Sequence, residues 1–182
     1  MNVARLRRDR RGSVAVEFAI MAQVFAVILV GTSEIGIVYM KRQQLNNTLA
    51  TATNYAMVNP AAVSASGGAA LATTLATILA NDGVAAPPIV SVVVNNGPQR
   101  SVTNNVATTS GTASDADRCY CPTKTTVVTW GASVTCGSTC TSGLFAGKFV
   151  ELRVQRVHVA VFAGYGGTVD GKISVASLVQ TE

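Results

Sequence analysis

The sequence predicts an α+β protein in which a long N-terminal transmembrane helix continues into a small antiparallel-sheet domain with a second helix. Three features predict this fold class: an apolar run from Val14 to Met40, a later series of short segments rich in Val and Ile, and four cysteines close together. We expect four regions, namely a basic leader (1–12), the transmembrane helix (13–40), its exported extension (41–59) and a disulfide-stapled outer domain (60–182).

Positive charge is concentrated at the N-terminus. The net charge is +5, but the first twelve residues hold five arginines and one aspartate, so the remainder is close to neutral. A nucleic-acid-binding protein would spread its basic side chains over a folded face. A short basic leader in front of an apolar run instead favours lipid head groups, so we expect membrane lipid as a partner and no nucleic acid. The leader arginines are Arg5, Arg7, Arg8, Arg10 and Arg11.

The run from Val14 to Met40 is long enough to cross a bilayer. As a helix it would rise about 40 Å, and a bilayer core needs roughly 20 apolar residues. A buried core helix is the alternative, but such helices rarely stay apolar over this length. Five arginines precede the run and only Lys41 and Arg42 directly follow it, which predicts a cytoplasmic N-terminus and an exported C-terminal domain.

Two acids interrupt the run, about 26 Å apart along a helix. Glu34 is expected to reach the outer interface. Glu17 lies just inside the inner edge, where a carboxylate is costly unless it is interfacial, protonated or paired. Cutting the chain between Gly12 and Ser13 would free an α-amine. A neighbouring copy could present this amine to Glu17 and so hold two parallel helices in register.

These residues resemble the class III signal of type IV pilin-like proteins, with Arg10-Arg11-Gly12 before the apolar run and Glu17-Phe18 at the fifth and sixth positions after Gly12. The continuation from Gly31 to Ala56 is similar to a TadE-like pseudopilin of the tight-adherence (Flp, type IVb) pilus assembly system. The resemblance covers about residues 5–58, and it departs from the family at Ala22-Gln23, where a proline is frequent.

The resemblance implies a type IV pilin-like fold and a place in the bacterial inner membrane or the pilus. It implies prepilin-peptidase cleavage between Gly12 and Ser13, with Glu17 as the carboxylate for processing and assembly and Glu34 as a second acid at the membrane edge. The implied partners are other pilin-like subunits, the pilus assembly platform and the prepilin peptidase. The implied role is assembly of pili used in surface adhesion.

Other interpretations remain open. In a secretory signal peptide the apolar core would be shorter, and the nearest small-x-small site, Ala50-Thr51-Ala52, lies well past Lys41 and Arg42. A signal-anchored domain that binds a periplasmic partner and never polymerises would have the same hydropathy pattern. A type II secretion pseudopilin is the third alternative.

Beyond the membrane run, the helix is expected to continue to Asn59-Pro60, because a residue before proline disfavours the helical conformation. An apolar stripe at helical spacing, Leu45, Leu49, Ala52 and Ala56, would pack on the chain's own domain or on partner subunits. A second amphipathic helix is predicted over Leu71–Leu79 and is closed by Asn81-Asp82-Gly83.

Several strands are predicted from runs of β-branched residues. They are Ile89–Val94, followed by an Asn95-Asn96-Gly97 turn, then Thr125–Trp130, Lys148–Phe162 and a last strand starting near Ile173. Pro98–Asp117 is polar and is expected to form a loop. The alternation in Lys148–Phe162 changes phase near Gln155, which predicts a bulge there, and Gly164–Gly167 predicts a turn.

The four cysteines are Cys119, Cys121, Cys136 and Cys140. An even number in an exported domain predicts disulfides, and the first two are too close for an easy mutual bond. Bridges to the second pair would be nested or crossed. A four-thiolate zinc site is the alternative, but a Cys-x-Cys pair fits its usual spacing poorly.

No catalytic constellation is visible, so we expect neither an enzyme nor a cofactor or metal site. His158 is the only histidine and falls in a strand pattern, where a packing or surface role is expected. Asp115-Ala116-Asp117 lacks the further oxygens of a calcium loop and is interpreted as a solvated turn.

Overall fold

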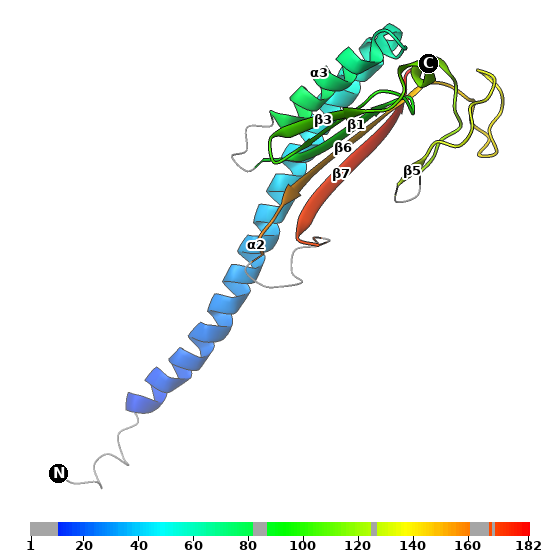
Figure 1. Cartoon of the computed structure of the whole chain (residues 1–182). Coiled ribbons are helices and arrows are strands. Elements are labelled where there is room, and N and C mark those ends of the chain that lie inside the picture. Colours follow the sequence, from blue (N-terminus) through cyan, green and yellow to red (C-terminus); the bar gives the residue numbers. More distant parts are fainter. Residues whose placement is uncertain (1–10, 82–86, 125–126, 161–167, 169) are drawn as a thin grey trace, which may run out of the picture.

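The structure is a computed structural model that describes residues 11–81, 87–124, 127–160, 168 and 170–182 (Figure 1). A long helix leads into a unit made of a second helix and an antiparallel sheet. The helical elements are α2 (Arg11–Val58), η1 (Pro60–Ala62), α3 (Gly68–Ala80) and η2 (Ala113–Asp117). The strands are β1 (Ile89–Val94), β2 (Gln99–Thr103), β3 (Val106–Ser110), β4 (Thr123–Lys124), β5 (Val128–Thr129), β6 (Phe149–Val157) and β7 (Lys172–Gln180).

Helix α2 is a single helix of 48 residues, and at ~1.5 Å per residue it forms a rod about 72 Å long. It ends where the sequence predicts, because Pro60 disfavours the helical conformation at Asn59. The side-chain amide of Asn59 donates to the carbonyl of Tyr55 at 2.8 Å, which satisfies one of the unpaired carbonyls of the last turn. The predicted continuous helix up to residue 58 is confirmed.

One stripe of α2 is buried by the rest of the chain. Its members are three, four or seven residues apart, the spacings that place side chains on one helical face. They are Gly31, Glu34, Val38, Leu45, Leu49, Ala52 and Ala56. Of the two predicted surroundings for the stripe, the chain's own domain is confirmed, since Ala52 and Ala56 are fully buried in a core shared with Leu75 and Leu79 of α3.

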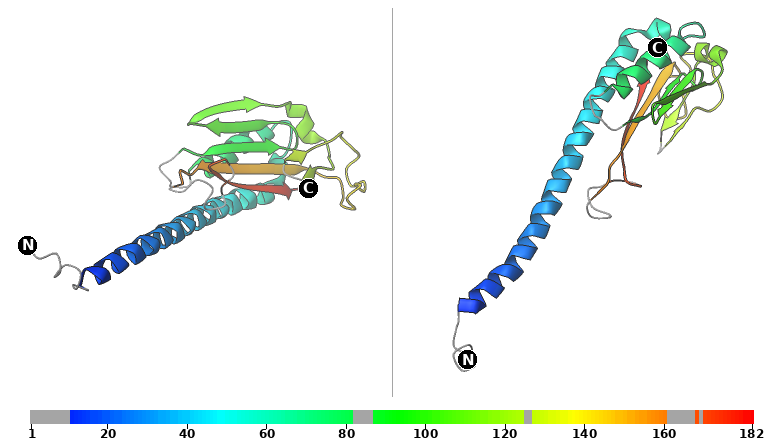
Figure 2. Two further views of the ribbon diagram at one scale, coloured as in Figure 1. Left: turned by 90° about the horizontal axis from the view of Figure 1, so that it is seen from below. Right: turned by 60° about the vertical axis from the view of Figure 1, so that its left-hand side comes forward.

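The sheet has the strand order β3-β2-β1-β6-β7, and every neighbouring pair is antiparallel. Alternate side chains along each strand point to one face. On the inner face they include Val92, Leu152 and Val175, all buried. Helix α2 contacts β6 and β7 while α3 contacts β1 and β2, so both helices cover this face, as the two views of Figure 2 show. The predicted α+β fold class is confirmed.

The expectation of a loop over Pro98–Asp117 is wrong for its first part, which forms β2 and β3. Asn95 and Asn96 have φ angles of 49° and 58° and connect β1 to β2; Asn104 and Asn105, at 50° and 64°, connect β2 to β3. Two consecutive left-handed residues suit tight antiparallel turns, and asparagine tolerates this conformation. Strand β3 is an edge strand exposed along its whole length, so it lacks the apolar alternation by which a sequence reveals a strand.

Strand β6 contains no bulge. Its register against β7 is continuous from Phe149 to Val157, so the predicted bulge at Gln155 is wrong. The change of phase in the sequence has another cause: Arg156 occupies the core-facing position at 3% exposure, and Val157 occupies the outer face at 54%. The strand also ends at Val157, earlier than the predicted Phe162, which lies outside the described residues.

Three further predictions have different outcomes. The prediction of a strand over Thr125–Trp130 is correct only for Val128 and Thr129, which form β5 and pair with the preceding two-residue strand β4; residues 125 and 126 lie outside the described part. The predicted turn at Gly164–Gly167 also lies outside the described residues. The last strand is confirmed as β7, and its Ile173, Val175 and Val179 are buried.

Candidate functional site

The segment Val14–Val30 of α2 is apolar on every side and projects away from the packed domain (Figure 1). Its large side chains are exposed, for example Phe18 at 73% and Met21 at 67%. A helix that is hydrophobic all round needs an apolar environment, and an exposed apolar surface of this size marks a contact with membrane or protein. Among the described residues, α2 is the one helix long and apolar enough to cross a membrane.

The predicted cleavage site lies at the very start of this helix. Helix α2 begins at Arg11, so Gly12 and Ser13 belong to its first turn. The other leader arginines, Arg5, Arg7, Arg8 and Arg10, lie outside the described residues. A cut between Gly12 and Ser13 would therefore leave the apolar segment whole.

Glu17 is exposed on the apolar segment, about one helical turn after Ser13. The neighbouring Phe18 and Ile20 are exposed at 73% and 60%. Within the described part of the chain, no hydrogen bond or ion pair holds the Glu17 carboxylate. Such an acid is costly in hydrocarbon unless another molecule supplies a positive group, so its surroundings leave it open to a neighbouring chain.

Glu34 is placed differently: it is 4% exposed and faces the domain. Its Oε1 lies 3.6 Å from Nε2 of His158, which directly follows β6 and is 7% exposed. On the other side of the ring, Nζ of Lys41 lies 3.3 Å from Nδ1. Because an ammonium group only donates, Nδ1 accepts, and the proton of a neutral ring then sits on Nε2, facing Glu34.

We call Glu34, Lys41 and His158 the helix–sheet polar cluster. Its Glu34–His158 distance is longer than a hydrogen bond, so that contact is electrostatic. The cluster joins α2 to the end of the sheet nearest the exposed apolar segment. No sequence pattern predicts the cluster, although an acid in an apolar run and a histidine in a strand pattern each need a polar partner when they are buried.

The two disulfides are Cys119–Cys136 and Cys121–Cys140, so of the two arrangements left open the crossed one is present. We call residues 118–147 the disulfide lobe. The bridged residues are 17 and 19 apart, and a loop of this size stabilises by roughly 3 kcal/mol in the chain-entropy account. All four sulfurs are used in these bonds, which leaves no thiolate for the zinc alternative.

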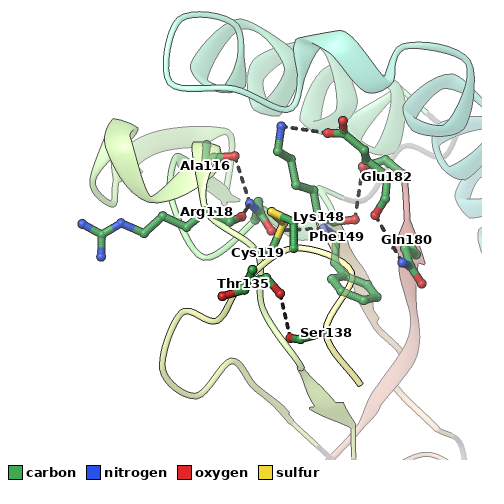
Figure 3. The surroundings of a disulfide bond; sticks show 12 residues. Ala116, Arg118, Cys119, Thr135, Ser138, Lys148, Phe149, Gln180 and Glu182 are labelled. Carbon is green, nitrogen blue, oxygen red and sulfur yellow. Dashed lines mark hydrogen bonds and ion pairs between the residues drawn. A yellow bond between two sulfur atoms is a disulfide. The ribbon is translucent and has the colours of Figure 1, made fainter. Parts of the chain in front are cut away.

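Asn95 joins the disulfide lobe to the sheet. It is fully buried, and its Nδ2 donates to the carbonyls of Ala116, at 2.9 Å, and Arg118. Its Oδ1 accepts from the backbone N–H of Phe149 at 3.1 Å. Figure 3 shows Ala116, Arg118 and Phe149 gathered around Cys119. The sequence identified Asn95 only as a turn residue, because no pattern reveals that its side chain points inward.

The acids of Asp115-Ala116-Asp117 have structural contacts in η2. Asp117 Oδ1 accepts from the backbone N–H of Ala65 at 2.8 Å, and Asp115 lies 3.7 Å from Nε of Arg118. Neither is arranged with further acids as a calcium loop requires. Across the described ranges, no three His, Cys, Asp or Glu side chains are grouped so that they could hold a metal ion.

A long apolar helix packed on a five-stranded antiparallel sheet with a second helix defines a pilin-like architecture. Residues 12–53, which lie entirely within α2, match the family model described as TadE-like protein, so the resemblance of this segment to the TadE-like family is confirmed. No curated protein and no solved structure matches the chain. The family match suggests a role in Tad pilus assembly.

Proposed function

We propose that this chain is a minor, non-enzymatic, pilin-like subunit for the assembly of tight-adherence pili used in surface adhesion. One observation carries the proposal: Glu17 is exposed on an otherwise apolar helix, one turn after the Gly12–Ser13 bond and open to a neighbouring chain. The family match over residues 12–53 supports it, because it covers the cleavage site, Glu17 and Glu34 together.

The proposed location is the bacterial inner membrane, crossed once. Val14–Val30 lies in lipid, the arginine-rich leader lies in the cytoplasm, and the sheet lies outside. The excess of arginine before the apolar segment favours this orientation. Both disulfides lie on the exported side, which is an oxidising compartment in bacteria.

The proposed mechanism starts with the prepilin peptidase, which removes residues 1–12 and frees the amine of Ser13. A helix does not readily bring its own first amine to its own fifth side chain, so the amine of one subunit meets Glu17 of the next. This pairing neutralises a carboxylate in hydrocarbon and fixes the offset between parallel helices. The pilus assembly platform then acts on helices held in this register.

A secreted form cut after Ala52 receives little support. It would lose Leu45 and Leu49, which are 1% and 8% exposed in the core. Burying one such side chain contributes about 1.5–3 kcal/mol, so the released domain would lose much of its stability. Retention of α2 on the folded domain therefore favours an anchored subunit.

The intact mass of the protein purified from its native membrane tests this proposal. We expect a chain that begins at Ser13 and lacks four thiol hydrogens because of the two disulfides. A functional chain that retains Met1 would overturn the assembly mechanism and leave a signal-anchored binding domain. A chain that begins after Ala52 would mean a secreted protein.

Substitution of the carboxylate tests its role separately. Glu17→Gln and Glu17→Ala should abolish or strongly reduce pili, counted by electron microscopy, while export of the domain, followed by protease accessibility in spheroplasts, stays normal. Gln23→Ala is the matched control, because Gln23 is a polar residue on the same exposed segment. Normal pili in both Glu17 variants would refute this role.

A further inference from the structure

The exposed apolar segment is slightly too short to span a bilayer by itself. Val14–Val30 is about 25 Å long as a helix, whereas the hydrocarbon core of a bilayer is about 30 Å thick. If α2 crosses the membrane, as the proposed function requires, hydrocarbon must extend roughly three residues further, to Ser33 and Glu34. The buried stripe of α2 begins at Gly31, so the folded domain already lies beside the helix at that level.

A groove opens at this level between α2 and the segment that follows β6. Its volume is about 420 Å³, within the ~300–1,000 Å³ typical of small-molecule sites. Leu29, Val30, Ile37 and Val159 provide apolar walls. Val159 is 87% exposed, the largest exposed fraction among the described large hydrophobic side chains, and the groove gives this exposure a reason.

The polar groups of the groove lie toward its domain end. Lys41 comes about 18 Å after Leu29 along the helix axis, and it lines the groove together with His158. One hydrogen of the Lys41 ammonium is directed to Nδ1 of His158, at 3.3 Å, which leaves two donors for a ligand. The hydroxyl of Ser33 is already donated to the carbonyl of Leu29 at 2.8 Å.

The carboxylate of Glu34 does not prevent an anion from binding at the mouth of the groove. Glu34 is 4% exposed, and its Oε1 lies 3.6 Å from Nε2 of His158. The accessible charge is therefore the cation of Lys41. The groove thus combines an apolar wall toward the bilayer centre with a positive group toward the water, the same order of groups as in a phospholipid of the outer leaflet.

We propose that this groove binds a phospholipid of the leaflet facing the domain, with an acyl chain along Leu29, Val30 and Val159 and the phosphate at Lys41. The lipid fills the gap between the helix and the base of the domain. The bound lipid also places the near end of the sheet in the head-group layer. The domain therefore keeps a fixed height and tilt relative to the membrane.

Depth-dependent fluorescence quenching tests the depth of the groove in the full chain. Trp130 is the only tryptophan, and Trp130→Phe keeps an aromatic ring against Tyr120. In this background, Val159→Trp is reconstituted into phosphatidylcholine–phosphatidylglycerol vesicles with lipids brominated near the top of the acyl chains. Ile28→Trp reports the transmembrane segment, and Leu144→Trp reports an exposed site in the disulfide lobe.

We expect Val159→Trp to be quenched at least half as strongly as Ile28→Trp, and Leu144→Trp to be unaffected. Quenching of Ile28→Trp without quenching of Val159→Trp would overturn the lipid site but leave the membrane anchor intact; a groove filled by another subunit's helix gives this result. Absence of quenching at Ile28→Trp would overturn the anchor and the lipid site together.

A second measurement tests the head-group contact. Native mass spectrometry of the protein released from detergent should show a retained phospholipid that falls severalfold in Lys41→Gln. Arg42→Gln is the matched control, because Arg42 is the adjacent cation, is exposed and does not line the groove. Equal loss of lipid in both variants would mean general charge attraction and would refute a specific phosphate site.

Discussion

Glu17 and Glu34 lie on the same helix, yet their surroundings are opposite. Glu17 is exposed among apolar side chains, whereas Glu34 is buried beside His158. A carboxylate tolerates burial only when polar or positive groups replace its water. The protein's own domain supplies such groups to Glu34, and our proposal has a second subunit supply one to Glu17. Burial therefore distinguishes Glu34, which contacts the chain's own domain, from Glu17, to which our proposal gives a role in assembly.

At the residue scale, Asn95 is the polar side chain on which we expect the fold to depend most. Asn95→Ala removes three hydrogen bonds of a buried side chain and forces alanine into a left-handed conformation (φ 49°). Unsatisfied buried groups cost about 1–3 kcal/mol and the conformation about 1–2 kcal/mol. We expect the free energy of unfolding in urea to fall by roughly 2–5 kcal/mol.

Asn104→Ala separates these two contributions. Asn104 has nearly the same backbone conformation, with φ 50°, but its side chain is exposed. This variant should lose only the conformational part, about 1–2 kcal/mol. Equal destabilisation by Asn95→Ala and Asn104→Ala would contradict a stabilising role for the Asn95 amide.

At the element scale, α2 has two parts with different surfaces. From Val14 to Val30 it is exposed all round, and from Gly31 to Ala56 one stripe packs on the domain. The stripe contains alanine where α2 is fully buried, at Ala52 and Ala56, so the helix can lie close to the core. A single helix thus has an exposed apolar segment at one end, which our proposal places in the membrane, and a core element at the other.

Enlarging one alanine should separate the helix from the domain. Ala52→Leu inserts three carbons at a fully buried site, and overpacking of this kind costs about 1–3 kcal/mol. Ala50→Leu, two residues away on the exposed side of the same helix, should leave stability within about 0.5 kcal/mol. Thermal unfolding of both variants in detergent measures the difference, and equal melting temperatures would show that the stripe is not tightly packed.

At the scale of the whole molecule, the buried residues of the described part form two clusters. The main one joins α2, α3 and the sheet, and the smaller one lies in the disulfide lobe around Cys119, Cys140 and Ala146. A few polar contacts connect the lobe and its flanking residues to the rest of the chain. They include the side-chain hydrogen bonds of Asn95 and the ion pair between Lys148 and Glu182, at 2.8 Å (Figure 3). The lobe therefore depends on its disulfides more than the sheet does.

Removing one disulfide should loosen the lobe and spare the sheet. In the double variant Cys121→Ala/Cys140→Ala we expect a loss of roughly 3 kcal/mol confined to the lobe. Hydrogen exchange should accelerate at the N–H groups of Tyr120 and Val134, which bond to Gly147 and Cys119 at 2.9 Å. Protection in β1 and β6 should persist. Equal loss of protection in β6 would mean that the lobe and the sheet unfold together.

The elements that the sequence predicted correctly are those with an apolar run or a repeating apolar pattern. The first half of α2 and strand β1 are runs of apolar or β-branched residues. The buried stripe of α2, α3 and β7 show the period of their structure, because one face of each is buried. Strands β2 and β3 show no such period, since β3 is exposed and β2 is half-buried for most of its length. The alternation in β6 was misinterpreted at Arg156, a charged residue in a core-facing position.

Of the candidate site, the sequence alone determined the apolar segment, the leader charge and the position of Glu17 relative to Gly12 and Ser13. All of these are separations along one helix, which has a fixed rise per residue. Only the tertiary structure decided that Glu34 is buried against His158, that the disulfides are crossed and that a groove lies beside Lys41. These features join residues up to 130 positions apart, from Leu29 to Val159 across the groove. Local propensity carries no information about such pairs, because their contact depends on how the sheet closes on the helix.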